Sequence, residues 1–229
     1  MQIRVNLKIF IFIIIFYLTR QIEIYGILML FAFLHELGHL FAGLFLGFRP
    51  QSLTVNPLGL AINFEIKADD YNEKIAKGNM LALKKLIIAA SGPAVNFMLS
   101  MLFVIFNIEM LGITQEILVY SNLLIGLFNL IPIYPLDGGR ILKNILHITT
   151  GLKNTYSYIN FISNTSIVIL TIFSSIMILY LENISIVFII GYLWYLVITE
   201  NKFYMQRRRI YEIIDNNANH TEPTHENAQ

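Results

Sequence analysis

The segment from Phe33 to Gly43, FLHELGHLFAG, carries His35, Glu36 and His39 within an apolar run. Residues four apart on a helix lie on one face, about one turn apart, so both imidazoles can bind one metal ion. This is the H-E-x-x-H arrangement of zinc peptidases, in which the glutamate is the general base. Zinc lowers the pKa of bound water, polarises the scissile carbonyl and stabilises the oxyanion. The pattern therefore predicts zinc-dependent hydrolysis of a peptide bond.

The apolar surroundings of these three residues strengthen that prediction. Each ionisable side chain in a membrane span costs roughly 3 kcal/mol unless it is paired or bound to a metal. Three such side chains within five positions therefore need a compensating partner. A hydrogen-bonded cluster between helices and a proton relay are the alternatives to a metal ion.

Two histidines and a water leave one position for a third protein ligand. His220 and His225 fall in a polar tail, and His147 follows an apolar span. Asp137 is the better candidate, since it lies at the cytoplasmic end of that span, in FNLIPIYPLDGGRIL, where prolines and glycines break the helix. Broken backbone at membrane depth is tolerated where it lines a cavity. A turn or a helix cap is the alternative role for Asp137.

The composition indicates a membrane protein that positions these residues on helices. Of 229 residues, 56% are hydrophobic and 14% are charged, against about 25% charged in a typical soluble domain. A span needs about 20 mostly apolar residues. We predict an all-α polytopic fold with six transmembrane helices in residues 1–200, followed by a short cytoplasmic tail, 201–229, that is partly disordered. The six predicted spans are 5–19, 24–46, 86–107, 116–135, 159–180 and 184–199.

The distribution of lysine and arginine predicts the orientation. If the N-terminus is cytoplasmic, all 16 basic residues except Arg20 fall on the cytoplasmic side, as the positive-inside rule requires. Both termini are therefore expected in the cytoplasm of a multi-pass protein of the cell membrane. The first apolar run lacks a small-residue cleavage site, so we expect a retained span rather than a signal peptide. The chain has no cysteine and a net charge of +1, so thiolate metal sites are excluded and no nucleic-acid partner is expected.

A different periodicity follows the histidine-bearing segment. From Leu58 to Ile66, apolar residues alternate with small or polar ones, which is typical of a strand. Asn56 and Pro57 precede this stretch and form a turn signal. We predict a small β-hairpin-like, membrane-associated segment at about 51–66, with an ordinary loop as the alternative.

Three motifs in order carry a family resemblance: HELGH, ASGPAVNF (Ala90 to Phe97) and NLIPIYPLDGGR. Together, over residues 5–200, they resemble the site-2 protease family of intramembrane zinc metalloproteases, peptidase family M50. The six-span layout most resembles the sporulation branch, which includes stage IV sporulation protein FB. The resemblance implies one Zn²⁺ per chain, bound by His35, His39 and Asp137.

The resemblance also implies roles for other residues of the motifs. Glu36 would be the catalytic base. Asn96 and Asn129 would lie near the active site and bind substrate or the oxyanion, since an amide N–H can donate to developing negative charge. For Asn96, an interhelical hydrogen bond is the alternative.

The implied function is an intramembrane zinc endopeptidase that cleaves a membrane-embedded or membrane-associated protein near the cytoplasmic face. A transcription-factor precursor, in regulated intramembrane proteolysis, is one such substrate, and regulatory membrane proteins would be further partners. Members of the sporulation branch often continue into a nucleotide-sensing domain. Residues 201–229 are too few for one, so no nucleotide-binding domain is expected. A non-enzymatic metal-binding scaffold or an ion pathway is the alternative, which Glu36 disfavours.

Overall fold

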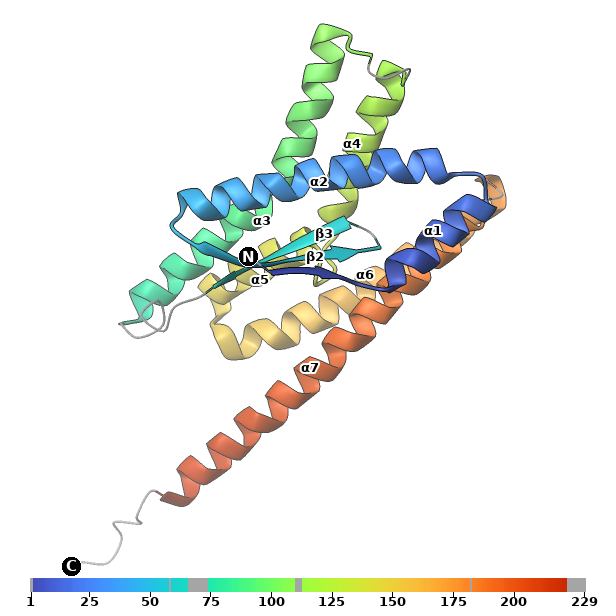
Figure 1. The fold of residues 1–229 in the computed structure, drawn as a ribbon. Coiled ribbons are helices and arrows are strands. Elements are labelled where there is room, and N and C mark those ends of the chain that lie inside the picture. Colours follow the sequence, from blue (N-terminus) through green and yellow to red (C-terminus); the bar gives the residue numbers. More distant parts are fainter. Residues whose placement is uncertain (1, 58, 66–73, 110–112, 182, 222–229) are drawn as a thin grey trace, which may run out of the picture.

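The computed structural model describes residues 2–57, 59–65, 74–109, 113–181 and 183–221. Seven helices and a three-stranded sheet occur in this part of the chain (Figure 1). In chain order they are β1 (Gln2–Val5), α1 (Lys8–Leu18), α2 (Ile22–Phe45), β2 (Arg49–Asn56), β3 (Gly59–Glu65), α3 (Lys74–Phe106), α4 (Gln115–Asn129), α5 (Asp137–Thr150), α6 (Leu152–Leu181) and α7 (Ser185–Thr221).

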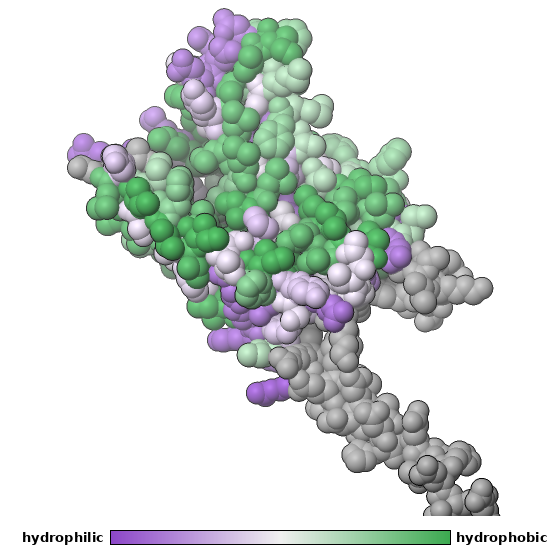
Figure 2. Space-filling model, turned by 180° about the vertical axis from the view of Figure 1, so that it is seen from behind, coloured by the Kyte–Doolittle hydropathy of each residue, from purple (hydrophilic) through white to green (hydrophobic). Residues whose placement is uncertain are grey.

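Four of the described helical segments are long and apolar enough to cross a membrane. They are Ile22–Phe45, Asn79–Phe106, Asn154–Tyr180 and Ser185–Gln206. Many large apolar side chains are exposed on the protein surface. Figure 2 shows them covering much of one face, with hydrophilic residues mainly toward its ends. A surface of this kind is stable in lipid rather than in water.

The expectation of six spans is not confirmed. Helix α1 has 11 residues and helix α4 has 15, or about 17 Å and 23 Å of helix, against a hydrocarbon core of about 30 Å. The predicted span 5–19 is shorter because residues up to Val5 pair with β2 instead. The predicted span 116–135 ends as a helix at Asn129, ahead of Pro132 and Pro135.

Helix α7 extends well beyond the last predicted span. It continues without interruption to Thr221, so most of the segment expected as a partly disordered tail is helical. Residues 222–229 of that predicted tail lie outside the described residues.

The described residues are mostly helical, as predicted, and they also contain a small sheet with the strand order β1-β2-β3. The pair of strands predicted at about 51–66 is present as antiparallel β2 and β3, although Leu58 and Ile66 lie outside the described residues. Strand β1 pairs with β2 in parallel and was not predicted. The sheet packs beside α2 (Figure 1), and the Tyr25 hydroxyl of that helix donates to the Pro57 carbonyl oxygen at 3.0 Å.

Two apolar clusters fix the two parts of the protein that carry the site. One joins α2, α3 and α4 through Phe31, Phe103 and Leu118. The other joins α6 and α7 to the segment between α4 and α5; it contains Ile133, Ile167, Ile190, Leu193 and Val197. Burial of these side chains holds α2 against α3 and α4, and holds the segment before α5 against α6 and α7.

Candidate active site

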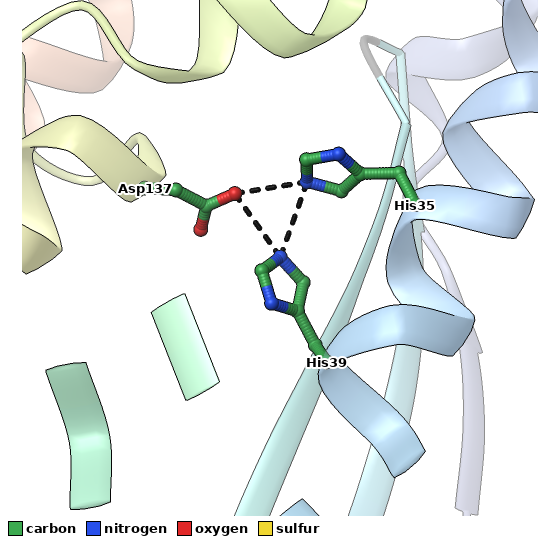
Figure 3. Close-up of side chains that lie close together, drawn as sticks. All are labelled: His35, His39 and Asp137. Carbon is green, nitrogen blue, oxygen red and sulfur yellow. Dashed lines mark hydrogen bonds and ion pairs between the residues drawn. The ribbon is translucent and has the colours of Figure 1, made fainter. Parts of the chain in front are cut away.

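His35 and His39 of α2 meet Asp137, the first residue of α5, in a buried cluster (Figure 3). The Asp137 Oδ2 atom lies 2.9 Å from His35 Nε2 and 3.0 Å from His39 Nε2. The two Nε2 atoms are 3.1 Å apart. Within the described ranges, this is the one group of three side chains placed to hold a metal ion.

The hydrogen bonds behind the cluster determine what it offers to a metal. His39 Nδ1 lies 2.6 Å from the carbonyl oxygen of Ile88. A carbonyl only accepts, so Nδ1 carries the proton and Nε2 presents a lone pair to the cluster. The Nε2 atoms of the two histidines and Oδ2 of Asp137 therefore lie about 3 Å from one another. A cation bound between these atoms would stabilise the arrangement.

The spacing of these atoms also fits zinc. Ligands about 2.0 Å from a tetrahedral zinc ion lie about 3.3 Å from one another. The observed separations of 2.9, 3.0 and 3.1 Å are close to this value. Two imidazoles and a carboxylate are a ligand set typical of catalytic zinc sites.

Asp137 reaches the histidines because the chain turns sharply between α4 and α5. The Leu136 N–H donates to the Ile133 carbonyl oxygen at 2.7 Å, and the Tyr134 N–H donates to Ser163 Oγ at 3.0 Å. A Cβ atom at Gly138 would overlap the Leu130 backbone, so glycine permits this close approach. The turn places the Asp137 carboxylate at a helix N-terminus, where the helix dipole favours negative charge.

The opposite wall of the cluster is formed by α3 at Gly92. A Cβ atom there would overlap Nε2 of both His35 and His39. Glycine therefore leaves the space that the imidazole rings and a metal ion require.

Glu36 is buried and lines a cavity of about 150 Å³ together with the three clustered side chains. Its Oε1 atom accepts a hydrogen bond from the Ile62 N–H of β3. The cavity is further lined by Leu60, Asn129 and Arg140. The carboxylate thus lies between the metal-binding cluster and the edge of the sheet.

The two asparagines of the motifs lie in different environments. Asn129, at the end of α4, lines the cavity, and its Nδ2 donates to the Ile125 carbonyl oxygen at 2.9 Å. Asn96 is fully buried behind the cluster, with Oδ1 2.5 Å from His35 Nδ1. Only Asn129 is therefore placed to meet a molecule in the cavity.

Sequence reasoning missed Arg140, which lines the cavity and lies 3.6 Å from Asp137 Oδ1. The three-residue spacing of these opposite charges in DGGR was the available signal, because such residues are neighbours on a helix. His147 lies on the same helix but is not part of the cluster. Burial and the charges of Lys85 and Lys143 lower the pKa of His147 below its ordinary value.

Comparisons with known proteins relate part of this chain to zinc metalloproteases. Residues 109–173 match the sequence model of Peptidase family M50. Zinc metalloprotease MJ0392 of Methanocaldococcus jannaschii is 34% identical over 131 residues, which is 53% of this chain and 34% of that protein. The matched region thus spans about a third of the relative's length.

A solved structure shares the fold. The site-2 protease from Methanocaldococcus jannaschii superimposes with a TM-score of 0.63 over 86% of this chain and 89% of that one, at 23% identity. A second similar protein, the putative zinc metalloprotease sll0528 of Synechocystis, is 32% identical over 125 residues, and the His–His–Asp cluster of this chain could hold a metal ion. Part of this chain is therefore similar to Peptidase family M50 and to the zinc metalloprotease MJ0392, and its fold is that of the solved site-2 protease.

Proposed function

We propose that this protein is an intramembrane zinc endopeptidase in which His35, His39 and Asp137 bind the metal and Glu36 is the base. The observation that carries the proposal is the convergence of three acceptor atoms, about 3 Å apart, beside a buried carboxylate in one cavity. Buried ionisable groups in a membrane protein are costly unless they serve such a site.

When bound, zinc would polarise the scissile carbonyl and make water a stronger nucleophile. Glu36 takes the proton from that water and delivers it to the leaving amine. Arg140 holds Oδ1 of Asp137, which leaves Oδ2 directed at the histidines. Asn129 lines the same cavity and is placed to bind the substrate backbone.

The edge of β3 is the proposed docking site for the substrate. Val55 of β2 accepts from the Asn6 N–H, so its backbone groups face away from β3. Leu60 is opposite Val55, so its backbone N–H and C=O point away from β2, toward the edge of β3 that pairs with no other strand among the described residues. Ile62 faces the same way, since its N–H donates to Glu36.

An extended substrate segment would pair with this edge. A helix conceals its carbonyls in its own hydrogen bonds, so a substrate must unwind before its peptide bond is attacked. Adding the unwound stretch as a strand beside Leu60 and Ile62 satisfies its backbone groups and brings it to the cavity that Glu36 lines.

The membrane orientation and biological setting belong to the proposal. The basic residues support cytoplasmic termini, and His39 lies six residues before the end of α2 at Phe45, or about 9 Å along the helix. We therefore place cleavage near the cytoplasmic face, with a membrane-anchored precursor protein as the substrate class. The likeness of the three motifs to the site-2 protease family supports a role in regulated intramembrane proteolysis.

The test is a pair of variants co-expressed with single-span reporter proteins that carry a cytoplasmic tag. Glu36→Gln removes the base but no ligand, so zinc is retained and cleavage falls by about 10²-fold or more. His35→Ala loses both zinc and cleavage. Zinc content of the purified proteins and tag release measure the two effects. A parent chain that binds zinc but cleaves at the rate of Glu36→Gln would favour a metal-binding scaffold instead.

A further inference from the structure

A chain of hydrogen bonds leads away from the metal cluster into the helix contact behind it. His35 Nδ1 lies 2.5 Å from Asn96 Oδ1 of α3. Asn96 Nδ2 donates to Asn122 Oδ1 of α4 at 3.0 Å, and Asn122 Nδ2 donates to the Leu118 carbonyl oxygen at 2.8 Å. Both asparagine side chains are fully buried.

The last member of this chain sets the direction of every bond in it. The Leu118 carbonyl can only accept, so Asn122 must direct its NH₂ toward Leu118 and its oxygen toward Asn96. Asn96 must then direct its NH₂ toward Asn122 and its oxygen toward His35. Because that oxygen accepts a hydrogen bond, the Nδ1 atom of His35 must carry the proton.

A proton on Nδ1 leaves the lone pair of His35 on Nε2, the atom that lies 2.9 Å from Asp137 Oδ2. The other tautomer would direct an N–H at the position of the metal. His39 obtains the same result from a single bond to the Ile88 carbonyl oxygen. His35 instead depends on two amides, each of which could present either end without the fixed carbonyl.

We propose that Asn96 and Asn122 are positioning residues that hold His35 in its metal-binding tautomer and orientation. This inference rests on the proposed function, since it assumes that His35 binds zinc. It replaces the expectation that Asn96 contacts substrate or an oxyanion, because both ends of its amide are occupied by His35 and Asn122.

Zinc affinity of the purified full chain, measured by competition with a chelator, tests the assignment. Asn96→Leu keeps the volume but removes the acceptor, and zinc affinity falls about 10- to 100-fold, as for other outer-shell partners of metal ligands. Asn96→Asp keeps an acceptor for Nδ1–H but loses the donor to Asn122, so its zinc affinity falls less than that of Asn96→Leu. Ser100→Ala is the matched control, because Ser100 donates to Val119 across the same α3–α4 contact; its affinity is unchanged.

Asn122→Ala tests whether the orientation of the Asn96 amide matters. The variant leaves Asn96 beside His35 but removes the partner that fixes which end of the Asn96 amide faces His35. Its zinc affinity falls by roughly threefold or more. This variant decides the question if Asn96→Leu does not accumulate in the membrane.

Unchanged affinity in Asn122→Ala, or equal losses in Asn96→Leu and Asn96→Asp, would reduce both residues to an ordinary interhelical contact and overturn the assignment. A parent chain that binds no zinc overturns the proposed function and the assignment together. A parent that binds zinc as tightly as Asn96→Leu overturns the assignment alone.

Discussion

Adding one methyl group at Gly92 is expected to weaken zinc binding strongly. A Cβ atom there would lie 2.5 Å from His35 Nε2 and would also overlap His39 Nε2. Ordinary van der Waals contact begins at about 3.4 Å, so each ring must retreat by roughly 0.9 Å. Metal–ligand distances tolerate only about 0.2 Å. Displacing two ligands by several times this tolerance should weaken zinc binding in Gly92→Ala by about 100-fold or more.

The helix backbone itself tolerates Gly92→Ala, because alanine in a helix is favoured over glycine by about 1 kcal/mol, and this gain offsets part of the roughly 1–3 kcal/mol cost of overpacking. Gly26→Ala and Gly191→Ala are matched controls in α2 and α7, where a Cβ atom would meet nothing within 4 Å. Zinc competition and reporter cleavage should both be parental in the controls and strongly reduced in Gly92→Ala. If Gly92→Ala binds zinc within threefold of the parent, the cluster is not the metal site as described.

Three further outcomes are expected. Asp137→Ala should lose zinc on elemental analysis; retained zinc at parental affinity would exclude Asp137 as a ligand. Leu60→Pro removes an N–H from the open edge of β3 and should lower kcat/KM of reporter cleavage about fivefold or more, the worth of one main-chain hydrogen bond of ~1 kcal/mol, with zinc content unchanged. Ala61→Pro, whose N–H faces β2, should instead lower thermal stability, and equal behaviour of the two variants would refute the docking edge. Topology reporters fused after Lys153 and Asn183 should report cytoplasm and outside respectively, and the reverse result would invert the orientation.

The residues of the candidate site were predictable where their signals are local. His35, Glu36 and His39 lie within one helical turn, and their spacing alone places them on one face. Asp137 is about a hundred residues away in sequence, yet the prolines and glycines around it predicted the broken backbone that lets it approach. The alternation after Pro57 predicted β3 for a similar reason, because strand periodicity is visible within a few residues.

The remaining parts depend on contacts that no local pattern shows. Strand β1 forms because Gln2 to Val5 meet Ser52 to Val55, about 50 residues later. The apolar pattern of the predicted span 5–19 did not indicate that Val5 would be part of a strand rather than of the helix. Asn122 and the adjacent Ser121 are small polar residues in an apolar stretch, and the importance of Asn122 follows only from α3 and α4 packing together. The length of α4 likewise could not be predicted, because the helix ends at Asn129 where the turn before Asp137 begins.

The amide of Ile62 has a single hydrogen, and that hydrogen is already donated to Glu36. A strand that docks on β3 must compete for the same donor, so binding of the strand and release of the carboxylate are coupled. A segment that stays helical has no free carbonyl with which to take the Ile62 N–H, and it leaves Glu36 engaged. If Glu36 is the base, as proposed, its release from this contact would depend on the backbone conformation of the incoming segment. Selectivity for unwound segments would then be built into one main-chain group of β3.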